Sequence, residues 1–269
     1  MKAISFVIGR INRVRTEWAK TRCLREAKGS EEIYREDWDS SLADPLAFYL
    51  HCFRYFHCRM PAKYKEHRAY FSAAGRGFGE DAFHVMWWLL FREFRPRLFL
   101  EIGVYRGQTL SLLSLLQQEH GISGEVVGIS PFQPVGDRVS RYREDVQYLE
   151  DTQSNFTHFS LPQPTLLKAY SSDPVAVACI RSRSWDCIYI DGNHDYEVVK
   201  ADWAVCSETL REGGLIVMDD SGLSSSYRPP IFSTGGHPGP SQVAQEVDPS
   251  RFREILQVGH NRAFLKIRQ

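Results

Sequence analysis

Residues 185–220, WDCIYIDGNHDYEVVKADWAVCSETLREGGLIVMDD, decide the fold because they predict a strand, a helix and a second strand in succession. Two apolar runs, residues 187–190 and 215–218, have the length and composition of buried parallel strands. Between them apolar residues recur at helical spacing, and Gly213 and Gly214 end the helix. Polar side chains, Asp202 among them, are expected on its other faces. The stretch therefore predicts a βαβ unit of a parallel α/β sheet.

Chemically active side chains follow both of these strands. Asp191 and His194 come after the first, and Asp219 and Asp220 come directly after the second. The carboxyl ends of the strands line the ligand crevice of an open parallel sheet, so these side chains should converge there. Any one of them alone is equally well explained as a turn, helix-start or loop residue. Four of them at two adjacent strand ends favour a functional site.

A second strand, turn and helix lie upstream, in residues 97–116. The strand closes on Glu101, a turn with Gly103 and Gly107 follows, and glycine there allows a ligand to approach the backbone at the helix start. Residues 125–129 and 166–170 predict two further strands. Residues 252–258 and 262–267 predict an antiparallel hairpin. The expected fold is thus α/β, with a mostly parallel sheet closed by an antiparallel carboxyl-terminal hairpin.

Four motifs, LEIGVYRGQT, VVGISPF, IDGNHDYEVVKADW and LREGGLIVMDD, resemble those of class I S-adenosylmethionine-dependent methyltransferases. Within that class they resemble the branch with macrolide-sugar and other small-molecule O-methyltransferases. The resemblance implies a Rossmann-like methyltransferase fold and an S-adenosylmethionine-binding domain over residues 97–269. It also implies a reaction, methylation of a hydroxyl of a sugar or other polyhydroxyl small molecule.

The resemblance further implies roles for individual residues. His194 matches the general base, expected as a neutral imidazole at physiological pH, and acts with Asp191. Some members of the branch hold a divalent metal, and the matching ligands are Asp191, Asp219 and Asp220, whose hard oxygens favour magnesium. The residues implied to bind the cofactor are Glu101, Gly103, Tyr105, Gly107, Ser130, Ser172, Asp173 and Asp191.

Ser130 departs from the family pattern, which usually ends this strand in an acidic residue that binds both ribose hydroxyls. A serine lacks the bidentate, charge-assisted hydrogen bonds of a carboxylate. A catalytically silent, methyltransferase-like binding subunit therefore stays open as an alternative. A nicotinamide-dependent oxidoreductase would share the first strand and turn, but the tight GxGxxG is absent because three residues separate Gly103 and Gly107.

Residues 1–96 form a separate segment, predicted to be helical and to cover the acceptor or mediate oligomerisation. It is rich in aromatic residues, and Lys and Arg outnumber Asp and Glu there by 17 to 12. Its first helix can lie on an anionic membrane surface, although packing on its own protein or on a second subunit is the more common role of such a helix. Residues 72–79, SAAGRGFG, are either a hinge or a simple helix connection. The apolar stripe of the first helix is Ile4, Val7, Ile8, Ile11, Val14 and Trp18.

Composition limits the remaining functions. The six cysteines form no CxxC pair, which indicates free thiols in a reducing compartment and not a zinc site. We find no membrane span or secretory signal and expect a cytoplasmic protein. Basic and aromatic residues do not alternate as in a nucleic-acid platform. Residues 221–240, rich in Gly, Pro and Ser, are expected to be irregular and either to close over the acceptor with Tyr227, Arg228 and His237 or to be a disordered surface loop.

Overall fold

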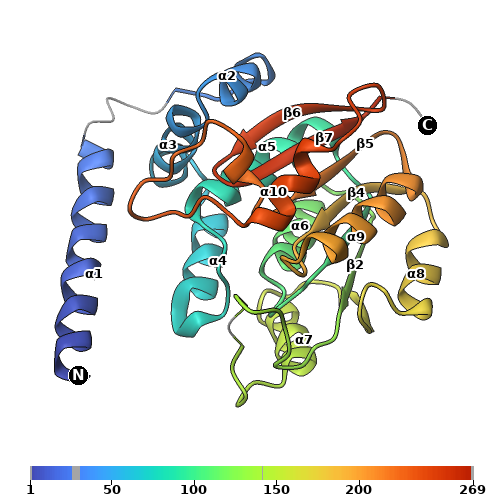
Figure 1. The fold of residues 1–269 in the computed structure, drawn as a ribbon, viewed down its shortest axis with the longest axis horizontal. Coiled ribbons are helices and arrows are strands. Elements are labelled where there is room, and N and C mark those ends of the chain that lie inside the picture. The colour runs from blue at the N-terminus through green and yellow to red at the C-terminus, as the bar shows by residue number, and fades with distance from the viewer. Residues whose placement is uncertain (1, 26–30, 141, 268–269) are drawn as a thin grey trace.

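The fold is that of one seven-stranded sheet covered on both faces by helices (Figure 1). The computed structural model describes residues 2–25, 31–140 and 142–267. Within these ranges it describes the side chain of residue 12 and all side chains from residue 14 on. The strand order is β3-β2-β1-β4-β5-β7-β6. The strands are β1 Leu98–Ile102, β2 Glu125–Ser130, β3 Thr165–Lys168, β4 Trp185–Ile190, β5 Leu210–Met218, β6 Phe252–Val258 and β7 Asn261–Lys266.

Strands β1 to β5 run parallel, whereas β7 is antiparallel to both β5 and β6. The central strands are rich in apolar residues because helices cover them on both faces. In β4, for example, Cys187 to Ile190 are all buried. The predicted α/β fold, with a mostly parallel sheet and an antiparallel carboxyl-terminal pair, is confirmed.

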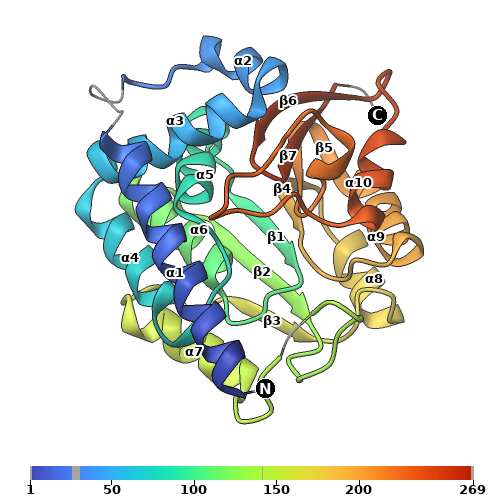
Figure 2. The same ribbon diagram turned by 60° about the vertical axis from the view of Figure 1, so that its left-hand side comes forward.

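The helices form two layers (Figure 2). On one face α6 packs on β1 and β2, and α5 packs beside α6 and on β6. On the other face α9 packs on β4 and β5, with α8 and α10 against it. The helices are α1 Lys2–Arg25, α2 Trp38–Ala43, α3 Pro45–Cys58, α4 Ala62–Ser72, α5 Asp81–Phe94, α6 Gln108–Glu119, α7 Tyr148–His158, α8 Pro174–Arg181, α9 Tyr196–Thr209 and α10 Pro238–Gln245, with short 3-10 helices η1 Arg35–Asp37, η2 Ala73–Gly75 and η3 Gly222–Ser224.

The amino-terminal segment is helical, and it packs directly on the sheet. Helices α2 and α3 contact β6, and α3 also packs along α5. Side chains of these helices share one hydrophobic cluster with the strands, for example Tyr49 and Trp87 with Tyr189 and Val258. Residues 31–96 therefore cover one face of the sheet and reach the edge where its strands end.

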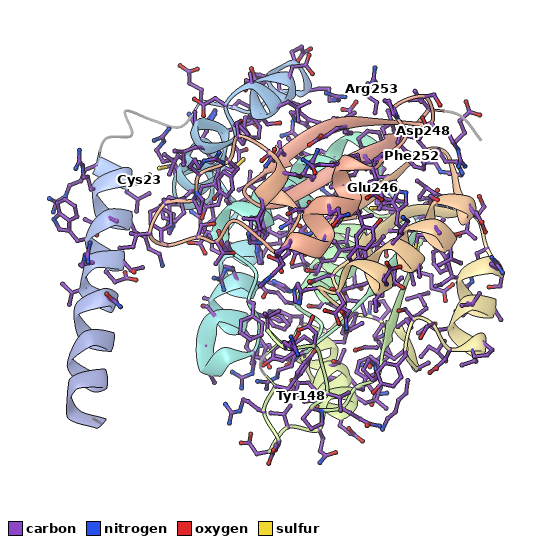
Figure 3. All side chains as sticks on the ribbon, in the orientation of Figure 1. Cys23, Tyr148, Glu246, Asp248, Phe252 and Arg253 are labelled. Atoms are coloured by element: carbon purple, nitrogen blue, oxygen red, sulfur yellow. The ribbon has the colours of Figure 1, made fainter. Side chains whose placement is uncertain are left out.

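Helix α1 stands at the margin of the molecule (Figure 1). Cys23, near its carboxyl end (Figure 3), is buried, and α1 contacts α3. Val14 and Trp18 are each 64% exposed, so this part of the expected apolar stripe is not covered. The side chains of Ile4, Val7, Ile8 and Ile11 lie outside the described residues. Among the described helices, none is both long and apolar enough to cross a membrane.

The helix face that carries Asp202 is covered, because Asp202 is buried against the loop after β3, where its carboxylate hydrogen-bonds Ser171. One expectation about local structure is wrong. Residues 221–240 are not wholly irregular, because η3 lies within them and α10 begins at Pro238. Proline is favoured in the first turn of a helix, where its missing N–H would have no partner. Tyr227 is buried in this stretch, which excludes a disordered surface loop.

Candidate active site

A cavity of about 420 Å³ opens at the carboxyl ends of β1, β4 and β5. Its walls come from the turn after β1, the segment after β4, the pair after β5, the start of α5 and the loop that follows β2. The predicted residues that line it are Glu101, Gly103, Tyr105, Asp191, His194, Asp219, Asp220 and His237. The two halves of the site expected from sequence therefore meet in one cavity.

Glu101, the fourth residue of β1, has a buried carboxyl group with one unsatisfied oxygen. The residue is 2% exposed, and its Oε2 has no hydrogen-bond partner among the described residues. Burial raises the pKa of Glu101 well above its ordinary value, an effect that the charge of Asp219 reinforces and a hydrogen bond from the Leu110 backbone opposes. A buried oxygen without a partner is costly, so this atom is suited to receive a donor from a ligand.

Gly103 and Tyr105 shape the turn after β1. Gly103 has φ +92°, and a Cβ at this position would collide with the backbone of Asp191 and Gly192. Its first role is therefore to let the ends of β1 and β4 approach each other closely, in addition to admitting a ligand. Tyr105 also has a positive φ, 48°, and its hydroxyl donates to the carbonyl of Gly75 at 3.2 Å.

Four predicted cofactor residues do not line the cavity. Gly107, with φ +79°, packs against Thr152 of α7 and starts α6. Ser130 ends β2 and is 9% exposed. Ser172 is exposed after β3, and Asp173 accepts from the Tyr170 N–H at 2.8 Å and precedes α8. The carboxylate of Asp173 is thus engaged in a local turn.

Asp191 and Asp219 form a half-buried carboxyl pair at the ends of β4 and β5. Burial and the negative charge of Asp219 raise the pKa of Asp191 well above its ordinary value. Burial also acts against ionisation of Asp219, but the neighbouring His260 outweighs it and lowers the pKa of Asp219. Because the two carboxyls hydrogen-bond each other, Asp191 carries the proton and Asp219 is ionised.

His194 is held between two carboxylates. Its Nδ1 lies 2.6 Å from Asp137 Oδ2 and its Nε2 lies 2.9 Å from Asp220 Oδ2. Asp137 Oδ2 also accepts the backbone N–H of His194 at 2.7 Å. Burial opposes a charge on the imidazole, but Asp220 and Asp137 outweigh burial and raise the pKa of His194 to about 9. The expected neutral imidazole is therefore wrong for this structure, in which His194 is charged at neutral pH.

His260, in the turn between β6 and β7, lies beside Asp219 and Asp220. Its Nε2 lies 3.2 Å from Asp219 Oδ1 and 3.8 Å from Asp220 Oδ1. The ring packs edge-on against Phe83 of α5, with 4.7 Å between ring centroids. Burial lowers the pKa of His260, but Asp219 and then Asp220 outweigh it and raise the pKa to about 10.

His237 is brought to the site by a tightly packed loop. Its backbone N–H donates to the Asp220 carbonyl at 2.7 Å. A Cβ on Gly236 would meet the backbone of Asp220, and one on Gly239 would meet the backbone of His194, so both glycines are needed for the close approach. The backbone of Asp220 itself is left-handed, with φ 50°. Of the three loop residues expected to contact the acceptor, His237 lines the cavity, whereas Tyr227 and Arg228 do not.

Helix α5 and the residue before it supply a wall that mixes polar and aromatic groups. Phe83, His84 and Trp87 line the cavity together with Glu80. The Tyr49 hydroxyl donates to Glu80 Oε2 at 2.5 Å, and burial raises the pKa of this carboxyl. The amino-terminal segment therefore contributes side chains to the site and does not merely shield it.

The loop after β2 folds over the cavity. Val139, Ser140 and Tyr142 line it, and Asp137 bonds His194 at the end of β4. Tyr148, the first residue of α7 (Figure 3), anchors the other end of the loop, because its hydroxyl accepts from the Arg143 N–H at 2.6 Å. This loop occupies the side of the crevice next to Ser130.

The predicted magnesium ligands do not assemble as one set. In the described part of the chain, two groups of three ligand atoms lie within 4.8 Å of one another, namely Asp219, Asp220 and His260, and His194, Asp220 and His237. Asp191 belongs to neither group. Both sets contain imidazole nitrogen, so the donor chemistry does not fit the all-oxygen magnesium site expected from sequence.

Sequence reasoning missed three residues of the site. Asp137 lies 57 residues before its partner His194 in a stretch without periodic pattern, and His260 sits in a hairpin turn. Glu80 precedes an apolar helix, where an acidic residue is ordinary. No spacing in the sequence links these residues to the strand ends, because each reaches the cavity only through tertiary packing.

Comparisons with known proteins agree with the geometry. Residues 100–221 match the family described as a methyltransferase domain. No curated protein matches the chain in sequence. Three of the solved structures that share the fold are described below. The Podospora anserina methyltransferase PaMTH1, bound to S-adenosylhomocysteine, is 14% identical in sequence, and the TM-score is 0.54. The alignment covers 89% of this chain and 100% of that one.

The other two are O-methyltransferases. The enzyme from Bacillus cereus, in complex with S-adenosylhomocysteine, is 15% identical in sequence, and the TM-score is 0.53. The alignment covers 87% of this chain and 100% of that one. TomG from Streptomyces achromogenes, which is involved in tomaymycin synthesis, was solved in complex with S-adenosylmethionine. It is 12% identical in sequence, and the TM-score is 0.51. The alignment covers 88% of this chain and 100% of that one. The predicted resemblance is confirmed: residues 100–221 match a methyltransferase-domain family, and the chain shares its fold with these solved methyltransferases.

Proposed function

We propose that this protein transfers a methyl group from S-adenosylmethionine to a hydroxyl oxygen of a small molecule. The observation that carries the proposal is a single cavity lined both by Glu101 and the Gly103 turn and by His194, Asp219 and Asp220. Methyl transfer is a direct displacement, which requires the methyl carbon and the acceptor oxygen to be held close together and in line. A cavity that joins the two groups of residues meets that requirement.

Glu101 is the residue proposed to hold the methionine part of the cofactor. Its buried Oε2 lacks a partner, and an ammonium group placed against it would form a charge-assisted hydrogen bond. The same charge would stabilise the ionised form of a carboxyl whose pKa is otherwise raised by burial. S-adenosylmethionine supplies the electrophilic methyl group. Tyr105 and Gly103 would border the cofactor, and Ser130 would offer only a hydroxyl near the ribose.

His194 is proposed as the general base. Its ring lines the cavity, and Asp137 fixes the orientation of the ring by accepting from both the backbone N–H and Nδ1. The imidazolium must first pass its Nε2 proton to the Asp220 carboxylate, whose Oδ2 lies 2.9 Å away, before Nε2 accepts a proton from the acceptor hydroxyl. Asp191, which is protonated and hydrogen-bonded to Asp219, would hold the Asp219 carboxylate in position.

The acceptor is proposed to be a sugar or another polyhydroxyl compound. The lining of the cavity combines the rings of Phe83 and Trp87 with the polar groups of Thr234 and His237. Such a lining can pack an apolar ring face and bind hydroxyls at the same time. A divalent ion at Asp219 and Asp220 would lower the pKa of the acceptor hydroxyl.

The test combines binding and turnover. Calorimetry should show one molecule of S-adenosylmethionine bound per chain, and a labelled methyl group should pass to a hydroxyl in a panel of sugars, polyols and catechols. His194→Ala should abolish this transfer without weakening cofactor binding. Absence of S-adenosylmethionine binding, with binding of a nicotinamide dinucleotide instead, would refute the proposal. Binding without any transfer would favour a silent binding subunit, the reading that Ser130 keeps open.

A further inference from the structure

Helix α1 packs on the rest of the chain through a side that is not its apolar one. Four of its residues, spaced i, i+3, i+4 and i+7, share one side of the helix, namely Thr16, Ala19, Lys20 and Cys23. Each of them is buried or half-buried. Cys23 belongs to the hydrophobic cluster of α3 and the sheet, and Lys20 interacts electrostatically with Asp81 at the start of α5. This side of α1 therefore faces the protein.

The apolar stripe of α1 lies on a different side and faces outward. Val14 and Trp18, one helical turn apart, are each 64% exposed, whereas Cys23 is only 7% exposed. Both ribbon views show α1 on the outside of the molecule (Figures 1 and 2). In the sequence the same spacing continues the stripe toward the amino end with Ile4, Val7, Ile8 and Ile11. An apolar stripe turned away from its own protein marks a surface that binds something else.

Helix α1 is strongly basic, although the chain as a whole is neutral. Of the 33 basic and 33 acidic residues of the chain, residues 2–25 hold seven basic ones and a single acidic one, Glu17. The helix thus has a net charge of +6, and the remainder of the chain has one of −6. Arg15 is exposed near the stripe, and the guanidinium of Arg22 lies 5.7 Å from the centre of the Trp18 ring. The stripe is therefore accompanied by positive charge.

This combination favours an anionic lipid surface as the occupant of the stripe. Tryptophan is enriched where the apolar and polar parts of a membrane meet, and Lys and Arg beside it attract acidic headgroups. A second copy of the chain is the competing occupant. Pairing two α1 helices along their stripes, however, would bring a charge of +6 against another of +6. Opposite charge is supplied by acidic lipid and not by a second α1.

We propose that α1 binds the surface of an anionic phospholipid bilayer. The helix lies along the surface, with Val14 and Trp18 inserted at the level of the headgroups and the basic side chains near the lipid phosphates. This mode needs no membrane span, and none of the described helices is long and apolar enough to form one. The inference goes beyond methyl transfer, because lipid binding by α1 requires neither the cofactor nor the acceptor.

The experiment mixes the full chain with two kinds of vesicle and measures the bound fraction by flotation. One kind is phosphatidylcholine alone, and the other is equal parts of phosphatidylcholine and phosphatidylserine. We expect binding to the anionic vesicles to be about tenfold tighter or more, and to be lost when salt is raised to about 0.5 M. Trp18→Ala and Val14→Glu should each weaken this binding about tenfold. Because both residues are exposed, neither change should lower the Tm.

Val175→Glu is the matched control, since it makes the same change as Val14→Glu at a residue of α8 that is 55% exposed. It should leave vesicle binding unchanged. Equal binding to both kinds of vesicle, or binding to neither, would overturn the proposal. Anionic binding that survives both α1 substitutions would place the lipid contact on another surface. A chain that ignores vesicles but forms a dimer in analytical ultracentrifugation, and a monomer after Trp18→Ala, would show that a second copy covers the stripe.

Discussion

Asp137 and His194, 57 residues apart in the chain, are joined by two contacts to a single oxygen, because Asp137 Oδ2 lies 2.7 Å from the His194 backbone N and 2.6 Å from Nδ1. One carboxylate thus fixes both the backbone and the ring of the histidine at the end of β4. The loop after β2 and the proposed base are therefore coupled, and movement of the loop would release the imidazole.

Replacing Asp137 by asparagine should slow methyl transfer. The variant loses a charge-assisted hydrogen bond of roughly 1.5 to 3 kcal/mol, so kcat should fall about 10- to 100-fold, less than the roughly 100- to 10,000-fold loss expected for His194→Ala. The affinity for S-adenosylmethionine, measured by calorimetry, should stay within about twofold. Asp145→Asn, in the same loop but bonded only to the exposed Arg143, is the control. Equal rates for the Asp137 and Asp145 variants would leave Asp137 without a positioning role.

Replacing Glu101 by glutamine tests the cofactor side of the cavity. Glutamine keeps the shape of the side chain but removes the charge that would pair with the cofactor ammonium, so the Kd for S-adenosylmethionine should rise about 10- to 100-fold. Because the carboxyl is buried with a raised pKa, its loss should not lower the thermal stability. Glu125→Gln, at the opposite end of the neighbouring strand, should bind the cofactor normally. Unchanged affinity in Glu101→Gln would move the methionine site elsewhere.

Gly103 makes a prediction about folding stability. Alanine at a positive φ costs about 1 kcal/mol from backbone strain alone. At Gly103 its Cβ would also collide with the Asp191 backbone, so we expect a total of about 3 kcal/mol or more and a clearly lower Tm. Gly121→Ala separates the two effects, because Gly121 has φ +63° and nothing within 4 Å of the added Cβ. Equal losses of Tm in both variants would show that β1 and β4 tolerate separation at this point.

The sequence predicted the sheet well because its central strands contain short apolar runs. Residues 187–190 and 215–218 fall inside β4 and β5, and the expected hairpin differs from β6 and β7 by one residue at most. The register between parallel strands then places Asp191 and Asp219 side by side. Strand ends are thus the part of a site that periodicity can locate.

The protonation states of the site could not be predicted from the sequence. His194 was expected to be neutral, but the two carboxylates beside it come from a loop 57 residues earlier and from the end of the next strand. Asp202 was expected on a face other than the apolar one, but helical spacing does not say what covers that face. In the structure the loop after β3 covers it. Charge and burial depend on contacts between distant segments, which local patterns do not contain.

Asp202 gives a prediction about pH. Burial raises its pKa from an ordinary value of 3.8 to about 6, although a hydrogen bond with Ser171 acts in the opposite direction. The folded chain therefore binds more protons at this site than the unfolded chain between roughly pH 4 and pH 6. The contribution of Asp202 to stability is fully present below pH 4, is lost as the pH rises through this window, and is constant above it.

Asp202→Asn removes this titration while keeping an oxygen that can accept from Ser171. The variant should be more stable than the original chain at pH 7 by about 1 to 3 kcal/mol, and the difference should shrink steadily toward pH 4. Urea unfolding of both proteins at several pH values measures it, since other titrating groups cancel in the comparison. Glu197→Gln, on the exposed side of the same helix, should show no such pH-dependent difference. If Asp202→Asn is less stable than the original at pH 7, the ionised carboxylate is stabilising α9, and the burial argument for its pKa is wrong.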